Sequence, residues 1–171
     1  EEVTLNLNEL TVANGRAQRG GGIFNIGTLT VSNSTFSDNS AVTASYYGAG
    51  GGIYNDDGTL AISNSTFSDN STEDGYGGGG ISTFGGTVSV SNSTFFSNRA
   101  VNSSGGGIAS VSRGGTITVT NSTFSGNSAS ASGGGIYNLG TLTVNNNIFF
   151  GNSAAGGGGI LSDAGTVTVS S

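Results

Sequence analysis

One unit recurs from end to end of this chain, and it constrains the fold more than any other feature. The copy at 133–152 reads GGGIYNLGTLTVNNNIFFGN: a glycine run with an isoleucine, a Gly-Thr turn, Leu and Val alternating with Thr, and a Phe followed three residues later by Asn. Self-similarity with a period of about 20–50 residues is typical of a solenoid. Spacings of 30, 28, 27, 28 and 24 residues separate the isoleucines that anchor the copies: Ile23, Ile53, Ile81, Ile108, Ile136 and Ile160.

The alternation inside each unit predicts strands rather than helices. In the copy at 27–32, Leu29 and Val31 share one face, and Thr28, Thr30 and Ser32 share the other. Glycine at this density disfavours a helix, and no window has apolar residues at helical spacing. We therefore predict three short strands per rung, a rung being one full turn of the solenoid. The first is the glycine run ending in the isoleucine, the second is the Leu/Val segment, and the third carries the inward Phe. Parallel crossovers are right-handed, so the fold class is an all-β, right-handed parallel β-helix of about six rungs.

The chain of 171 residues has 33 glycines and is rich in Ser, Thr and Asn, a composition that often indicates disorder. Here the large apolar residues recur at fixed places, so we predict one continuous core shared by neighbouring rungs. Residues 1–171 are expected to form a single β-helix domain that is part of a longer or polymerising chain. The predicted core residues are Ile23, Leu29, Val31, Phe36, Ile53, Phe67, Ile81, Phe95, Ile108, Phe124, Ile136, Phe149 and Ile160.

Composition excludes several functions. The net charge is −6 with only four arginines, which argues against a nucleic-acid partner. No stretch approaches the ~20 apolar residues of a membrane helix, so no membrane insertion is expected. The chain has no His, Lys or Cys, which leaves carboxylates as the only plausible catalysts. It begins at Glu1 without a visible signal peptide, so we expect a processed chain or a piece of a longer one.

Asparagine recurs at two places in each unit, and both columns are predicted to be structural ladders. Asn suits tight turns, and stacked amides hydrogen-bond to one another. One column is Asn33, Asn64, Asn92, Asn121 and Asn146; the other is Asn39, Asn70, Asn98, Asn127 and Asn152. Five of them (Asn33, Asn64, Asn70, Asn92 and Asn121) begin an Asn-x-Ser/Thr sequence. A glycosylation acceptor should be exposed, so we interpret that match as accidental.

Asp38 and Asp69 occupy equivalent positions in adjacent rungs. Paired carboxylates could share a proton, bind calcium or flank a glycosidic bond. The next copies have Ser97, Gly126 and Gly151 there, which favours solvated turn residues. We predict no catalytic residue, no metal site and no cofactor.

Insertions of varying length interrupt the repeat after Asn39 and after Asn70. Such insertions map to exposed loops on one edge of a solenoid. Tyr46, Tyr47 and Tyr76 are therefore expected together on that edge. The acidic pairs at 56–57 and 73–74 are interpreted as solvated loop charges.

Threonine and serine form two outward columns on the Leu/Val strand. The first is Thr28, Thr59, Thr87, Thr116, Thr141 and Thr166; the second is Thr30, Ala61, Ser89, Thr118, Thr143 and Thr168. On a flat sheet, hydroxyls spaced ~7 Å along strands and ~4.8 Å between strands can order water in an ice-like lattice. The alternative is that Thr simply suits an exposed strand.

The pairing of Gly-Gly-x-Ile with Phe-x-x-Asn resembles the repeats of polymorphic outer-membrane proteins. It is also similar to the wider group of bacterial surface proteins with pectate-lyase-like, right-handed β-helix repeats. Residues 16–171 carry the resemblance, through copies such as GGGIFN…STFSDN, GGGIYN…STFSDN and GGGIYN…NIFFGN. It implies secretion to the cell surface and a role in adhesion or as a stalk. The catalytic Lys/Arg and the calcium-binding Asp clusters of pectate-lyase-like enzymes have no match here.

The chain opens and closes on the same strand type, with Leu5 and Leu7 at the front and Val167 and Val169 at the back. Exposed strand edges invite further strands. Two explanations stand: copies stack head to tail into a fibre, or neighbouring repeats of a longer solenoid cover both ends.

From these observations we predict a secreted, extracellular structural or adhesive β-solenoid that is not an enzyme. The expected partners are the chain itself, flanking solenoid repeats, surface glycans, or a host or neighbouring cell surface. An ice-binding surface is the first alternative, and a polysaccharide-binding or polysaccharide-cleaving β-helix is the second.

Overall fold

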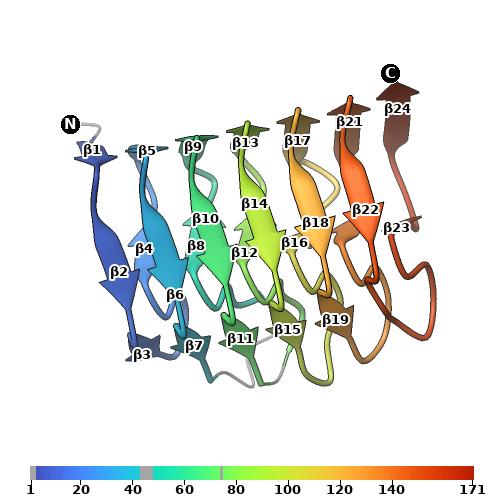
Figure 1. Ribbon diagram of the computed structural model, residues 1–171, viewed down its shortest axis with the longest axis horizontal. Coiled ribbons are helices and arrows are strands. Elements are labelled where there is room, and N and C mark those ends of the chain that lie inside the picture. Colours follow the sequence, from blue (N-terminus) through green and yellow to red (C-terminus); the bar gives the residue numbers. More distant parts are fainter. Residues whose placement is uncertain (1–2, 43–47, 74) are drawn as a thin grey trace.

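A computed structural model describes residues 3–42, 48–73 and 75–171 as a parallel β-solenoid. Successive rungs lie side by side along the long axis, with the two termini at opposite ends (Figure 1). Every strand pair is parallel and joins equivalent positions of neighbouring rungs, such as Phe67 with Phe95. The predicted all-β parallel β-helix is confirmed.

Four sheets, named A to D in the order in which the chain visits them, run the length of the solenoid. Sheet A comprises β1 (Thr4–Asn8), β5 (Thr28–Ser32), β9 (Thr59–Ser63), β13 (Thr87–Ser91), β17 (Thr116–Thr120), β21 (Thr141–Asn145) and β24 (Thr166–Ser170). Sheet B comprises β2 (Thr11–Ala13), β6 (Thr35–Ser37), β10 (Thr66–Ser68), β14 (Thr94–Phe96), β18 (Thr123–Ser125) and β22 (Ile148–Phe150).

The other two sheets complete each rung. Sheet C has two-residue strands: β3 (Arg16–Ala17), β7 (Ser40–Ala41), β11 (Ser71–Thr72), β15 (Arg99–Ala100) and β19 (Ser128–Ala129). Sheet D comprises β4 (Ile23–Asn25), β8 (Ile53–Asp56), β12 (Ile81–Phe84), β16 (Ile108–Ser110), β20 (Ile136–Asn138) and β23 (Ile160–Ser162).

The three strands predicted for each rung lie in sheets A, B and D. Sheet C adds a fourth strand of two residues that was not predicted. The glycine run itself precedes strand D instead of forming it. Its glycines cross the rung against the backbone of sheet C: a Cβ at Gly51 would lie 2.5 Å from the carbonyl oxygen of Ser71, and one at Gly79 would lie 2.5 Å from the amide nitrogen of Arg99. Only glycine lets the two backbones approach this closely.

A column of stacked phenylalanines forms one side of the core. Ring centroids of successive members lie 4.8–4.9 Å apart, with interplanar angles of 3–11°. The inward isoleucines of sheet D and the Leu, Ile and Val side chains of sheet A fill the rest. All the predicted core residues lie in or against this core; Ile23, Phe149 and Ile160, near the ends, are partly buried.

The described residues at the ends of the insertions lie over sheet D: a Cβ at Gly48 would lie 3.3 Å from Ser82 Oγ. The Ala49 amide donates to the Tyr76 carbonyl at 3.2 Å, and the Gly77 amide donates to Ser103 Oγ at 2.7 Å, so successive loops pair with one another. Tyr54, which points outward from β8, is fully buried as a result. Of the three tyrosines expected on this edge, Tyr76 is 52% exposed, whereas residues 46 and 47 lie outside the described residues.

Candidate functional site

The Asn39 column forms a buried ladder where sheet B turns into sheet C. Asn70 Oδ1 accepts from the Asn39 amide at 3.1 Å and from its Nδ2 at 2.9 Å, and Asn70 Nδ2 donates to the Phe36 carbonyl at 2.9 Å. The same bonds recur at Asn98, Asn127 and Asn152. Every link has one direction: the side-chain oxygen accepts from the preceding rung.

A second ladder, which was not predicted from the sequence, lies between sheets A and B. Ser65 Oγ accepts from the Ser34 amide at 3.1 Å and donates to the Ser63 carbonyl at 2.7 Å. Ser93 and Ser122 repeat the pattern, and Asn147 Oδ1 ends it by accepting from the Ser122 amide at 2.8 Å. The signal was available, because Ser precedes the Thr-Phe pair in four copies.

A third ladder, also missed, lies between sheets D and A. Asn25 Nδ2 donates to Asn55 Oδ1 at 2.6 Å, and Asn55 Nδ2 donates to Thr83 Oγ1 at 3.2 Å. At the far end Asn138 Nδ2 donates to Ser162 Oγ at 3.1 Å. Three corners of each rung are therefore closed by buried polar side chains, consistent with the rule that buried polar groups are hydrogen-bonded.

The Asn33 column has a different role from the one predicted. All five members are exposed and have φ between 48 and 52°, the left-handed region that Asn tolerates. Their amides bond near the two ends of the column, Asn33 to Asn8 and Asn146 to Asn121. The backbone conformation explains the residue type here, and the adjacent serines make the buried ladder. A glycosylation acceptor should be exposed. Of the five asparagines of the two columns that begin an Asn-x-Ser/Thr sequence, only Asn70 is fully buried, so burial argues against glycosylation at Asn70 alone.

Asp38 and Asp69 lie at equivalent corners, both exposed and both with φ of 55°. Ser97 has the same φ, and Gly126 and Gly151 follow at 62°. The column therefore shares a left-handed corner rather than a chemical group. Among the described residues, no group of three or more His, Cys, Asp or Glu side chains could hold a metal ion.

Charged and aromatic side chains gather where the loops cover sheet D. Arg19 lies 3.9 Å from the Asp56 carboxylate and 5.9 Å from the centre of the Tyr54 ring, which Phe24 stacks against at 5.5 Å. Burial, and then the nearby Asp56, raise the pKa of Tyr54 to about 12. Burial, and then the charge of Asp57, raise the pKa of Asp56; the positive charge of Arg19 acts in the opposite direction.

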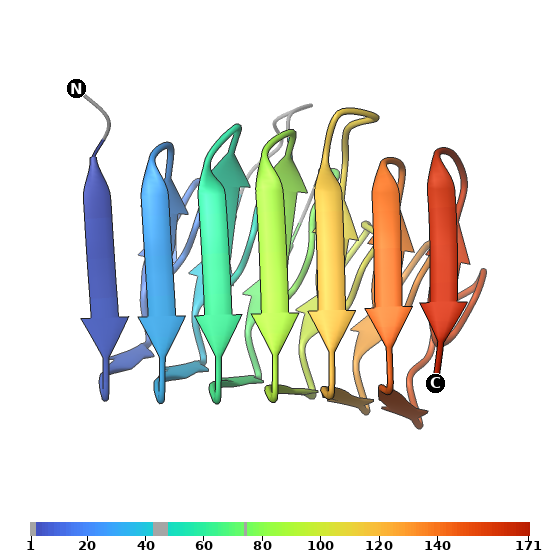
Figure 2. The same ribbon diagram turned by 90° about the horizontal axis from the view of Figure 1, so that it is seen from above.

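Sheet A is the regular exposed surface, and Figure 2 looks onto its strands lying side by side. Its register aligns one outward threonine from each of the seven strands in a single unbroken column, extending the predicted column to Thr4. The second column is interrupted by Asn6, Ala61 and Ser89. One column of hydroxyls therefore runs along this face from end to end.

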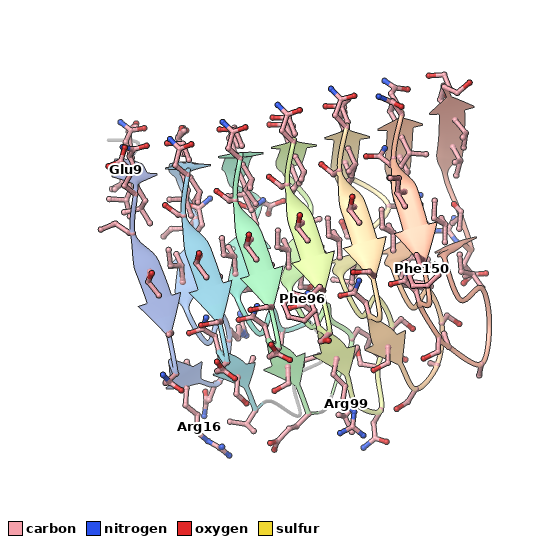
Figure 3. All side chains as sticks on the ribbon, in the orientation of Figure 1. Glu9, Arg16, Phe96, Arg99 and Phe150 are labelled. Carbon is pink, nitrogen blue, oxygen red and sulfur yellow. The ribbon has the colours of Figure 1, made fainter. Side chains whose placement is uncertain are left out.

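Sheet B carries exposed apolar side chains toward the C-terminal end. Phe96 is 42% exposed, Ile148 61% and Phe150 74%. Figure 3 shows Phe96 and Phe150 on β14 and β22, with Ser125 of β18 aligned between them in the register. Isolated exposed apolar residues are ordinary, but three on one small sheet form a candidate contact surface.

The candidate polymer ends lie on β1 and β24, the first and last strands of sheet A. Leu5 is 45% exposed, Val167 40% and Val169 70%, while Leu7 packs partly against the core. Head-to-tail stacking and flanking solenoid repeats both stay predictions.

The family described as the right-handed beta helix region matches residues 4–171, and the chain belongs to that family. The predicted right-handed coil is thereby confirmed, while the finer resemblance to polymorphic outer-membrane proteins stays a prediction. Neither a search of curated proteins nor a search of solved structures found a match. The described part of the chain contains no helix able to cross a membrane.

Proposed function

We propose that the chain is a rigid structural or adhesive segment of an extracellular surface protein, and that it is not an enzyme. The observation that carries this proposal is the continuity of the ladders. Asn39 is linked through successive amides to Asn152, and the phenylalanine stack runs beside them. Such a rod keeps its length and presents its outer faces to partners.

Surface location is tested with antibodies raised against the folded chain. Intact cells of the producing organism should be labelled as strongly as permeabilised cells. Labelling that requires permeabilisation would contradict an extracellular role.

Adhesion is tested with beads that display the chain and are offered to cells or immobilised surface glycans. The exposed apolar side chains of sheet B are the proposed contact, so Phe96→Ser with Phe150→Ser should reduce bead capture. Thr123→Ser, on the same sheet, is the matched control. Capture that is unchanged in the double variant would place adhesion on another face.

An ice-binding surface is the second candidate, favoured by the unbroken threonine column of sheet A. Hydroxyls at strand spacing on a flat sheet match the requirement for ordering water. Thermal hysteresis that is lost in Thr116→Tyr, at a residue of that column, and kept in Thr123→Tyr on sheet B would support it. A wild-type chain without hysteresis would eliminate it.

A further inference from the structure

The exposed corner between sheets A and B repeats one tripeptide in four consecutive rungs. Each copy reads Asn-Ser-Thr and begins at Asn33, Asn64, Asn92 or Asn121. All four asparagines are exposed, the serines that follow them are buried, and the threonines, on the outer face of sheet B, are half-buried. The Asn-x-Ser/Thr sequence therefore belongs to one surface of the solenoid, in its interior rungs.

A left-handed backbone admits asparagine at this corner but does not require it. The Asp38 column, at the corner between sheets B and C, has φ of 55–62° with Asp, Ser and Gly. The Asn33 column has φ of 48–52° with asparagine alone, from Asn33 in the second rung to Asn146. Glycine is the least strained residue in this region. Asparagine repeated at an exposed corner therefore indicates a use for its side chain.

The side-chain amides of this column are accessible. Asn33 Nδ2 donates to Asn8 Oδ1 at 2.9 Å, and Asn121 Oδ1 accepts from the next rung at 2.8 Å, in bonds between exposed groups. Within the described parts of the chain, the side chains of Asn64 and Asn92 make no hydrogen bond. A group attached to these nitrogens would extend into solvent beside sheets A and B.

Asn70 supplies a contrast within the same chain, because it begins an identical Asn-Ser-Thr tripeptide in the buried ladder. It is fully buried, and its Nδ2 donates to the Phe36 carbonyl and to Asn98 Oδ1, each at 2.9 Å. Thr72, the third residue of this copy, is fully buried as well. The tripeptide is the same, and only its surroundings differ.

We propose that Asn33, Asn64, Asn92 and Asn121 are acceptors of N-linked sugars, and that Asn70 is not. The donor class is an oligosaccharide joined to a lipid diphosphate. The asparagine Nδ2 forms a bond to C1 of the first sugar, the bond from C1 to the diphosphate oxygen breaks, and the lipid diphosphate leaves with one amide proton. The inference rests on the proposed extracellular role, because such acceptors are surface residues of secreted proteins.

The test maps sugars on the folded chain after secretion from a host that attaches N-linked oligosaccharides. The chain carries Asn102→Gln, which removes a further Asn-x-Ser/Thr sequence outside the column. The purified protein is denatured and treated with an amidase in water enriched in heavy oxygen, which converts each modified asparagine to a heavy aspartate. Peptide mass spectrometry should find this label at the four column asparagines and not at Asn70.

Matched variants connect the modification to the tripeptide. Thr94→Ala removes the hydroxyl of the third residue, so it should abolish the sugar at Asn92 and leave the sugar at Asn64. Thr94→Ser keeps a hydroxyl and should retain the sugar at Asn92. Thr94 is half-buried on the outer face of sheet B, so both variants should keep the circular-dichroism spectrum of the wild type.

A folded chain without sugar at the column, or with sugar at Asn70, would overturn the proposal. Loss of the sugar in Thr94→Ser would also overturn it, because the hydroxyl would then not define the acceptor. The chain isolated from the surface of the producing organism should carry the same pattern, and an unmodified chain there would contradict the inference. Failure of surface labelling would remove the extracellular role without altering the result in the host, so the two failures are distinguishable.

Discussion

Sheets A and D come from the same repeat, yet one is bare and the other is covered. Sheet A shows solvent a column of seven aligned threonines, whereas sheet D is overlain by loops that bury Tyr54 and Ala109 completely. The bare face is regular in residue type. The covered face varies from Phe24 through Ser82 to Leu161 along one register column.

The comparison teaches that position, rather than residue type, decides what a side chain does in this solenoid. Phenylalanine and asparagine each occur at covered and at bare positions, sometimes a few residues apart. Pairs of this kind supply matched substitutions, because the residue type is constant and only the surroundings differ.

Phenylalanine should give the largest contrast. Phe95 is fully buried between two stacked rings, so Phe95→Ala should lower the free energy of unfolding by ~3–5 kcal/mol through the cavity it leaves. Phe96→Ala, at a 42% exposed neighbour, should cost well under half as much. Chemical denaturation followed by circular dichroism measures both. Similar losses would show that the outer aromatic also stabilises the rod.

Asparagine should give the next largest contrast. Asn98→Ala removes the acceptor of the Asn70 amide and Nδ2, and the donor to the Phe67 carbonyl, so it should cost about 2–4 kcal/mol. The control is Asn92→Gly, at an exposed residue with φ of 48°, which should change stability by less than about 1 kcal/mol. A small effect at Asn98 would mean that water replaces the lost amide.

Much of the fold could be predicted because its determinants repeat. The alternation in each unit sets which side chains face inward, and the near-constant spacing aligns Phe67 with Phe95. Sheet C escaped prediction because its strands have two residues each, too few for an alternation to show. The cover over sheet D escaped it because the insertions differ in length and sequence.

The candidate site was less predictable, because one residue type serves two purposes. Asn39 and Asn33 both recur in every unit, but Asn39 is buried in a ladder and Asn33 holds an exposed left-handed corner. Recurrence alone does not separate these roles, since burial depends on which side of the corner a residue lies. The direction of the ladders requires atomic positions.

The covered face should also respond to alkaline pH. The pKa of Tyr54 is raised to about 12 by burial and by Asp56, so the folded state holds its proton more tightly than the unfolded chain. Its stabilising contribution is complete below the ordinary tyrosine pKa of about 10 and is lost as the pH rises toward 12.

Urea denaturation at pH 8 to 11.5 should therefore show a fall in stability that is shallower in Tyr54→Phe. Tyr137, whose pKa is raised by burial and then by Asp163, accounts for part of the remaining slope. The same slope in wild type and Tyr54→Phe would mean that the loops do not keep Tyr54 covered in solution.

The smallest effect is expected at the corner that holds Asp69. Asp69 has a φ of 55°, and Gly126 and Gly151, at the equivalent position, have a φ of 62°. All three lie in the left-handed region, so the position requires that backbone conformation and not a carboxylate. Asp69→Gly should change stability by less than about 1 kcal/mol, while Asp69→Val should cost about 1–2 kcal/mol because a β-branched residue is strained there. Thermal unfolding of the two variants measures the difference.

The same proteins test the proposal that the chain is not an enzyme. If the wild type cleaved a polysaccharide and Asp69→Gly abolished that cleavage, the Asp38–Asp69 pair would have a chemical role. If Asp69→Val were as stable as Asp69→Gly, the bare corner would tolerate any residue, and backbone conformation would not explain the recurrence of Asp, Ser and Gly along this column.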